Sequence, residues 1–485
     1  MKKLAILAAA AVLLAAALSV GQHLLVSGPR LRELVNTKPE ELLVEYDRAT
    51  AWVPGTLRFT NLRVRSRDPN VEWEFRMPSA RLDYAPLALL SRTFRVRRLV
   101  ASELVFHLRE RQHPDRVSRN APLFPRIEGY ADPPMRDPSE PPHPPRTSPP
   151  WTIRLDALDS GAAREIWIGP WRYQGDAHVS GGFTLQPGWR AEVGPATIEL
   201  RKVDLRVGED TVLSGAHGAA HCTIRSFDVR QVKGGEVWPY IDGDFALDGA
   251  VEALEFFRHF LDERSAPALR KGRGAAKVQI KIERGIGHGG ATLEAAGVEA
   301  KAAGGGLRGD LTLRAQLPRW DFEKSEMDVA GSRLELRDVT ASTRGGSETR
   351  WWGRARIAQG RIHGGLDARV EAECRDARPL YRLFSVKLPG WAEQMLDLED
   401  LRATAHLRLA SALTAFEGLS VTGGEYRISG EFEKVRDRAR GVFLVEKGKL
   451  AVAVQIDGEN HSVRPLGARE WYQAAAAEQR ERAKK

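Results

Sequence analysis

The feature that most constrains the fold is a repeated alternation of apolar and polar side chains between Trp151 and about Gly458. In each repeat, apolar residues alternate with charged or small residues, and a glycine, asparagine or aspartate then follows. Successive side chains of a strand point to opposite faces of a sheet, so this period of two predicts strands with one apolar and one solvated face. Short connections favour antiparallel pairing of sequence neighbours, so we expect long meanders.

The apolar positions of these strands form a candidate binding face. We count about 18 to 20 strands after residue 27 by this criterion, and an apolar face on each of them is unstable in water. The positions are mainly aliphatic. Those assigned to the face are Ile198, Leu200, Leu205, Val278, Ile280, Ile282, Leu311, Leu313, Leu334, Leu336, Leu407, Leu409, Val452 and Val454.

Helices are too few to cover such a face. Helical spacing is confined to short stretches at 250–264 and within 376–398, and no alternation of strands and helices supplies more. The sheet therefore either closes on itself around a filled interior or curls into a trough that holds an apolar ligand. The predicted fold class is mainly β, a long antiparallel meander curled into a groove or an elongated open barrel, with one N-terminal transmembrane helix and a few short helices. Because aliphatic residues dominate the face and large aromatics are few, the pattern favours a groove for acyl chains.

The N-terminus carries the only apolar run long enough to cross a bilayer, which excludes a multi-span channel or transporter. Lys2 and Lys3 precede a stretch from residue 4 to 26, and these lysines favour an inside N-terminus. A cleaved signal peptide with its core at 4–18 is the alternative. In either case we expect the chain after Ser27 to be exported. The predicted anchor residues are Leu4, Ile6, Leu7, Val12, Leu13, Leu14, Leu18 and Val20.

Changes in apolar spacing and in proline content divide the rest of the chain into segments. Helical spacing near Leu31 and Leu34, repeated at Leu42 and Leu43, gives way from about residue 50 to alternation. Residues 114–150 contain 12 of the 27 prolines, and proline has no amide hydrogen to donate to a sheet, so this tract should be an extended linker. The predicted divisions are an anchor at 1–27, a β block at 28–112, a proline-rich linker at 113–150, the main groove at 151–465 and an exposed helix or tail at 466–485.

Charge and motifs argue against several function classes. The net charge is +9, but arginines recur singly between apolar residues, as on the wet face of a sheet, rather than in a patch for nucleic acid. His217 and His221 have metal-like spacing, but on a strand they would lie about 13 Å apart. The glycine-rich 285–290 segment lacks a following helical pattern and predicts a hairpin. We therefore expect no enzyme activity, no cofactor, no metal and no nucleic-acid partner.

Several segments carry a resemblance to a known family. They read VPGTLRFTNLRV at 53–64, ARLDYAPLALL at 80–90, FRVRRLV at 94–100 and LVFHL at 104–108, with DARPL at 376–380 further along. In this order they resemble the opening of AsmA-like proteins of the double-membrane bacterial envelope, relatives of TamB and of the bridge-like lipid transfer proteins. The proline tract and the limited length depart from the large members.

The resemblance implies a single-pass inner-membrane protein with the bulk of its chain in the periplasm. It implies a curved β-sheet groove that binds or transfers phospholipid, or another acyl-chain lipid, for outer-membrane biogenesis. Twenty strands span roughly 95 Å, which is short for the envelope, so other envelope proteins are expected partners. The alternative is a structural or assembly factor of the envelope that acts through protein partners without lipid transport.

Overall fold

The computed structural model describes residues 19–483 except for 68–69, 116, 138–150, 188–189, 230, 233, 260–267, 303–304, 344–347, 377–398, 411–412, 437 and 459. Strands make up 67% of the described residues, so the prediction of a mainly β protein is confirmed. The described residues contain 26 strands, more than predicted, because several long strands are interrupted and count twice. The chain forms two compact units, Met1–Gly249 with Lys281–Gly285 (unit 1) and Ala250–Ile280 with Ile286–Lys485 (unit 2).

Unit 1 begins with helical residues 19–27 and continues mainly as strands. Its elements are α2 (Arg30–Val35), β1 (Leu42–Glu45), β2 (Arg48–Thr50), β3 (Thr56–Arg67), β4 (Val71–Tyr84), η1 (Pro86–Ser91), β5 (Thr93–Ser102), β6 (Leu104–Glu110), η2 (Ala121–Leu123), β7 (Thr152–Asp159), β8 (Ala163–Ile168), β9 (Trp171–Gln186), β10 (Arg190–Val207), β11 (Asp210–Asp228), η3 (Gly234–Tyr240) and most of β12 (Ile241–Val251). The helix predicted near Leu31 is present, whereas Leu42 and Leu43 lie in a strand, which corrects the helical prediction there.

The expectation of purely antiparallel pairing is wrong at one place in unit 1. Strand β4 pairs with β5 along one half and with β6 along the other, and all three pairings with β3, β5 and β6 are antiparallel. Strands β7 and β8, however, run parallel to β5 and β6. Parallel neighbours need a long crossover connection, and residues 111–151 supply it. The proline-rich tract is therefore the segment that returns the chain to the start of the next strand.

The described part of this crossover packs on the sheet. Residues 111–137 are here called the strap; those that the structure describes form no strand, and Gln112 forms an isolated bridge with Met135. Phe124 and Ile127 of the strap are buried. Proline chemistry thus keeps the strap out of the ladders, as predicted, but the strap covers part of one face of unit 1 instead of standing free of it. The remainder of the predicted linker, 138–150, lies outside the described residues.

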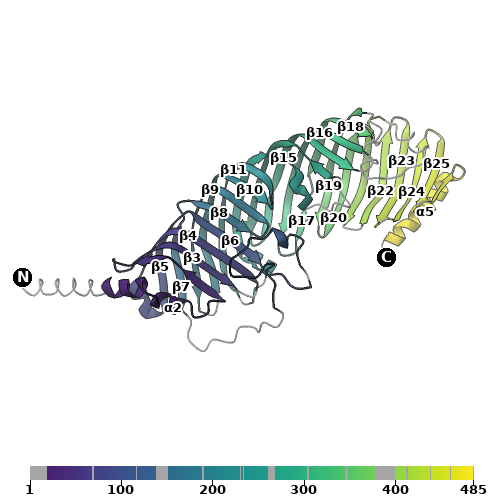
Figure 1. Cartoon of the computed structure of the whole chain (residues 1–485). Helices are drawn as coiled ribbons and strands as arrows, with labels where there is room; N and C mark the ends of the chain where they lie inside the picture. Colours follow the sequence, from purple (N-terminus) through teal and green to yellow (C-terminus); the bar gives the residue numbers. More distant parts are fainter. Residues whose placement is uncertain are drawn as a thin grey trace, which may run out of the picture. The chain divides into compact units, whose positions relative to one another are not determined.

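Unit 2 is a meander in which every described pairing joins strands antiparallel. Figure 1 shows β20 to β25 following one another in sequence order. Its elements are η4 (Glu255–His259), β13 (Ala268–Arg270), β14 (Arg273–Glu283, shared with unit 1), β15 (Ile286–Ala302), β16 (Gly305–Asp321), β17 (Glu326–Asp328), β18 (Arg333–Thr343), β19 (Glu348–Ile362), β20 (Gly365–Cys374), β21 (Leu401–Ala410), β22 (Leu413–Gly423), β23 (Tyr426–Val435), β24 (Arg438–Lys447), β25 (Leu450–Asp457), β26 (Asn460–Arg464) and α5 (Ala468–Ala483).

The turn between β14 and β15 confirms the predicted hairpin at the glycine-rich segment. Arg284 and Gly285 have φ values of 50° and 75°. Two successive residues with positive φ are typical of the tight turn whose twist matches that of a strand pair, and glycine adopts this conformation without strain.

The predicted helices agree with the structure only in part. The C-terminal helix is present, but it is not simply exposed, because Ala468 and Ala476 are buried and α5 packs on β23 to β25. At 250–264 the only helix among the described residues is the short 3-10 helix η4, and most of 376–398 lies outside the described residues. Within the described residues, no helix is long and apolar enough to cross a membrane. Most predicted anchor residues, Leu4 to Leu18, lie outside them, and Val20 is exposed.

Candidate functional site

One face of unit 2 carries a continuous row of apolar side chains, here called the C-terminal strip. Residues directly opposite one another in an antiparallel pair point to the same face of the sheet. The observed register therefore connects one residue from each strand, beginning at β15, passing to β16 and continuing from β18 to β25. At the usual strand spacing this row is about 43 Å long. Its members are Leu293, Leu313, Leu334, Ala355, Ala372, Ala403, Val421, Ile428, Val445 and Val452.

Most side chains of the C-terminal strip are only half-buried. Leu293 is buried and Leu334 is 37% exposed, with the others between these limits. Helix α5 does not cover the strip, because it packs on Leu444 and Ala453, which alternate with strip residues and point to the opposite face. Within the described residues, the strip side chains therefore shield one another within a single layer.

The opposite face of β18 to β21 is charged. Its central row contains Glu335, Arg354, Glu373 and Arg402, which are direct neighbours across β18 to β21. The guanidinium of Arg354 pairs with Glu373, and Arg402 Nε lies 3.9 Å from the same carboxylate. Opposite charges directly across a sheet stabilise the pairing. The two faces therefore differ in chemistry, one aliphatic and one ionic.

Unit 1 has a corresponding row, here called the N-terminal strip. It crosses β1, β3, β4, β6, β8, β9, β10 and β11, and the parallel pairing of β6 with β8 preserves it. Leu205 and Leu213 are buried, whereas Phe75 and Phe106 are half-buried and stack with ring centroids 4.5 Å apart. The members are Val44, Val64, Phe75, Phe106, Ile166, Tyr173, Leu205 and Leu213.

The strips bring together many residues that the alternation singled out. Leu205 belongs to the N-terminal strip, and Leu313, Leu334 and Val452 belong to the C-terminal strip. Other predicted residues lie an even number of positions from strip members on regular stretches of the same strands and so share their face. These are Leu311, Leu336, Leu407, Leu409 and Val454.

The other predicted residues lie on β10 and β14. Leu200 is buried and pairs with Ala177 and Gly218, and Ile198 is half-buried. Along β14 every second residue is exposed, and the half-buried positions between them include Val278, Ile280 and Ile282.

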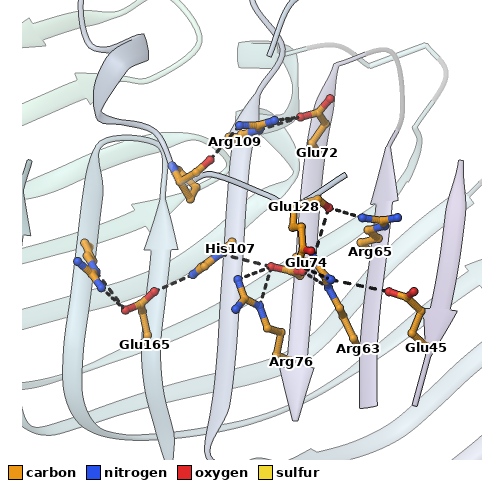
Figure 2. A network of polar contacts seen from close by, with 12 residues as sticks. Glu45, Arg63, Arg65, Glu72, Glu74, Arg76, His107, Arg109, Glu128 and Glu165 are labelled. Atoms are coloured by element: carbon orange, nitrogen blue, oxygen red, sulfur yellow. Dashed lines mark hydrogen bonds and ion pairs between the residues drawn. The ribbon is translucent and has the colours of Figure 1, made fainter. Parts of the chain in front are cut away.

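A network of charged side chains lies on the face of unit 1 opposite the N-terminal strip (Figure 2). It contains Glu72 and Arg109, both almost completely buried. Arg109 donates to Glu72 over 2.7 Å and to the strap carbonyls of Pro125 and Ala131 over 3.1 and 2.8 Å. Because buried charges are stable only when they are paired, this arrangement fastens the strap to the sheet.

His107 lies at the centre of the same network, between two carboxylates. Its Nε2 is 2.7 Å from Glu165 Oε1 and its Nδ1 is 3.6 Å from Glu74 Oε2. Burial lowers the pKa of His107, but the interactions with Glu165 and Glu74 outweigh burial, and the pKa is raised above 6.5.

The two carboxylates respond in the opposite direction. Burial alone would raise the pKa of Glu74, but the nearby His107 ring and hydrogen bonds from Arg76 and Arg63 lower it to about 2. The pKa of Glu165 falls to about 2 because hydrogen bonds from His107 and Arg172 outweigh its burial. The network therefore favours the protonated form of the imidazole, which lies between two carboxylates held in their ionised form.

Sequence reasoning missed this network. Glu72 and Glu74 alternate with Trp73 and Phe75, so the pattern assigned them to a solvated face. The signal that could have indicated burial is the proline-rich tract that follows β6, because it is long enough to fold back over that face. The described residues show no cluster of three or more potential metal ligands. His221 pairs instead with Asp244, at 2.9 Å.

Comparisons with protein families, with curated proteins and with solved structures give no match for this chain. The arguments for function therefore rest on the residues themselves.

Proposed function

We propose that this chain is an AsmA-like protein that is anchored in the inner membrane, faces the periplasm, and binds or transfers phospholipid along a groove that the C-terminal strip lines. The observation that carries the proposal is the C-terminal strip, an unbroken aliphatic row across successive strands with a charged row on its other side. A sheet with one apolar and one ionic face suits a ligand that has an apolar tail and a polar head.

The dimensions support the same ligand. One leaflet of a bilayer gives an acyl chain about 15 Å of depth, half the hydrocarbon thickness. The C-terminal strip, at about 43 Å, is therefore long enough for an acyl chain to occupy successive positions along it. Removal from water stabilises each methylene by about 0.8 kcal/mol both in a membrane and on the strip, so movement between them needs no chemical step.

Photocrosslinking within the full chain tests the proposal directly. Benzoylphenylalanine replacing Leu334, a partly exposed strip residue, should form adducts with phospholipid that are detected by mass spectrometry. The same group replacing Glu335, the next residue and on the opposite face, is the matched control and should give few. Adducts with protein alone at Leu334 would favour an assembly factor, and equal lipid yields at both positions would contradict a specific face.

A substitution on the neighbouring strand adds a quantitative test. Leu313 lies directly across from Leu334, so Leu313→Asp places a carboxylate beside the crosslinking group. The variant loses contact with about two methylenes of the lipid. This weakens lipid binding by roughly 1.6 kcal/mol and lowers the occupancy about tenfold. Thr292→Asp, at an exposed position on the other face of β15 and directly across from Arg314, should leave the lipid adduct yield unchanged. Similar yields from the two variants would refute lipid binding at the strip.

A further inference from the structure

Three segments of unit 1 expose large apolar side chains. Helical residues 19–27 expose Leu24, and the 51–56 loop exposes Trp52 and Val53. The short helix η1 exposes Leu87 and Leu90, which are 81% and 87% accessible. Single exposed apolar residues are ordinary, but a contiguous group of them marks an interaction surface.

Contacts of Gln22 and His23 join the three segments into one surface, here called the turn surface. The side-chain amide of Gln22 donates to the carbonyls of Val53 and Thr56 over 3.3 and 3.1 Å. Its oxygen accepts from the Gly55 amide and the Tyr84 hydroxyl, each over 3.1 Å. All four hydrogen bonds connect the helical residues to the loop and to the end of β4.

Ring contacts and a close approach of the backbone complete the connection. The His23 ring stacks on Trp52 with centroids 3.7 Å apart. Gly55 has a φ of 79°, and a side chain there would collide with the Tyr84 carbonyl, 2.9 Å away, and crowd the Pro86 ring at 3.3 Å. The loop therefore sits directly against the first residue of η1, so Trp52, Val53 and the leucines of η1 belong to the same surface.

The charges of the turn surface are all of one sign. Residues 19–30, 51–56 and 84–92 contain Arg30 and Arg92 but no aspartate or glutamate, although 28% of the whole chain is charged. Arginines beside exposed apolar side chains complement anionic lipid headgroups above an acyl layer. Tryptophan prefers the same boundary, because its ring is apolar and its N–H is polar.

We propose that the turn surface lies on an anionic phospholipid bilayer, with Trp52, Val53, Leu87 and Leu90 in its interface. The apolar stretch at 4–26 continues into helical residues 19–27, so a segment embedded in the membrane would bring the turn surface to the headgroups. This inference rests on the proposed membrane anchoring, but it assigns a bilayer contact to two turns that are distant in sequence from the anchor. It is independent of lipid binding at the strips.

Fluorescence quenching in vesicles tests the inference on the full chain. Cys222 and Cys374 are replaced by alanine, and an environment-sensitive fluorophore is attached through Leu90→Cys. The protein is reconstituted into phosphatidylcholine–phosphatidylglycerol vesicles with nitroxide-labelled lipid. The matched control is Leu466→Cys, because Leu466 is 89% exposed in unit 2 and is not part of the turn surface. Both positions are exposed, so neither substitution removes core packing.

We expect the nitroxide lipid to quench the label at 90 at least about twofold more strongly than the label at 466, as for a side chain in the interface. A second label at Leu87→Cys should behave like the label at 90. If the protein floats with the vesicles but the labels at 90 and 466 are quenched equally, the anchor stands and the inference is overturned. If the protein does not float with the vesicles, the proposed membrane anchoring and this inference both fail. If the fluorophore at 90 is not quenched by the lipid, and a photocrosslinker attached at the same cysteine captures a protein, the inference is also overturned in favour of a protein partner.

Discussion

Replacing Arg109 with methionine should release the strap from the sheet of unit 1. Methionine keeps most of the apolar stem of arginine, so the change removes charge and donors more than packing. Glu72, which is 2% exposed, then loses its closest partner, and the carbonyls of Pro125 and Ala131 lose buried donors.

The magnitude follows from what is left behind. An unpaired buried charge costs about 3–5 kcal/mol, and an unsatisfied buried carbonyl about 1–3 kcal/mol. Two other guanidinium groups partly compensate the charge of Glu72, because Arg67 Nε lies 3.7 Å and Arg111 Nε 4.0 Å from it. We therefore expect the lower end of the range, about 3 kcal/mol for strap opening.

Hydrogen exchange is the suitable assay, because a chain of two units need not unfold in one step. The reporting amides are those of Gln112 and Arg136, which bond to the Pro134 and Gln112 carbonyls and close the base of the strap. A cost of about 3 kcal/mol corresponds to roughly a hundredfold faster exchange at these amides. Amides of β24, in the other unit, serve as the internal control.

A double variant separates lost charge pairing from lost packing. Glu72→Gln combined with Arg109→Met removes both charges, so it should restore much of the protection lost in the single variant. The reasoning is refuted if Arg109→Met accelerates exchange less than about tenfold. It is also refuted if the double variant exchanges faster than the single variant.

Two further predictions concern pH and the C-terminal helix. Because the pKa of His107 in the folded chain is raised, its stabilising contribution is complete below the unfolded value of 6.5 and is lost as pH rises through the folded value. The thermal midpoint of unit 1 should therefore fall more steeply above pH 6.5 in the wild type than in His107→Gln, and parallel pH profiles would contradict this. On α5, Ala476→Asp buries a carboxylate at a fully buried position and should destabilise the packing of the helix by about 1–3 kcal/mol. Ala474→Asp, at an exposed position of the same helix, should change little, and trypsin cleavage after Arg480 measures the difference.

Alternation alone was sufficient to predict the mainly β fold, and it singled out four members of the strips, Leu205, Leu313, Leu334 and Val452. Both follow from local chemistry, because a period of two fixes which side chains share a face. The parallel pairing of β5 with β7 did not follow, because pairing direction depends on where the chain returns after residues 111–151, and no local pattern records that path. Leu42 and Leu43 were predicted as helical because short apolar runs fit either period.

The charged network was hidden from the sequence for a different reason. Glu72 and Arg109 are 37 residues apart, and their burial is created by a third segment, the strap. An alternating pattern does not distinguish a carboxylate on a solvated face from one that is buried beneath a strap. The α5 helix illustrates the same point, since alanines at 468 and 476 give no strong apolar stripe and yet are buried.

Breaks in the alternation carry information that the regular repeats do not. Between Leu336 and Val339 two polar residues intervene instead of one, which in a regular strand would move Val339 to the charged face. The structure places a register shift there, with Asp338 at a φ of 48°, and Val339 stays buried opposite Trp351. The same spacing between Leu200 and Val203 coincides with another shift, and both residues are buried. A bulge inserts one residue and restores the face of those that follow. Paired polar residues inside an alternating run therefore indicate where the strand bulges to keep its apolar side chains on one face, and this is how a face stays apolar across many strands of unequal length.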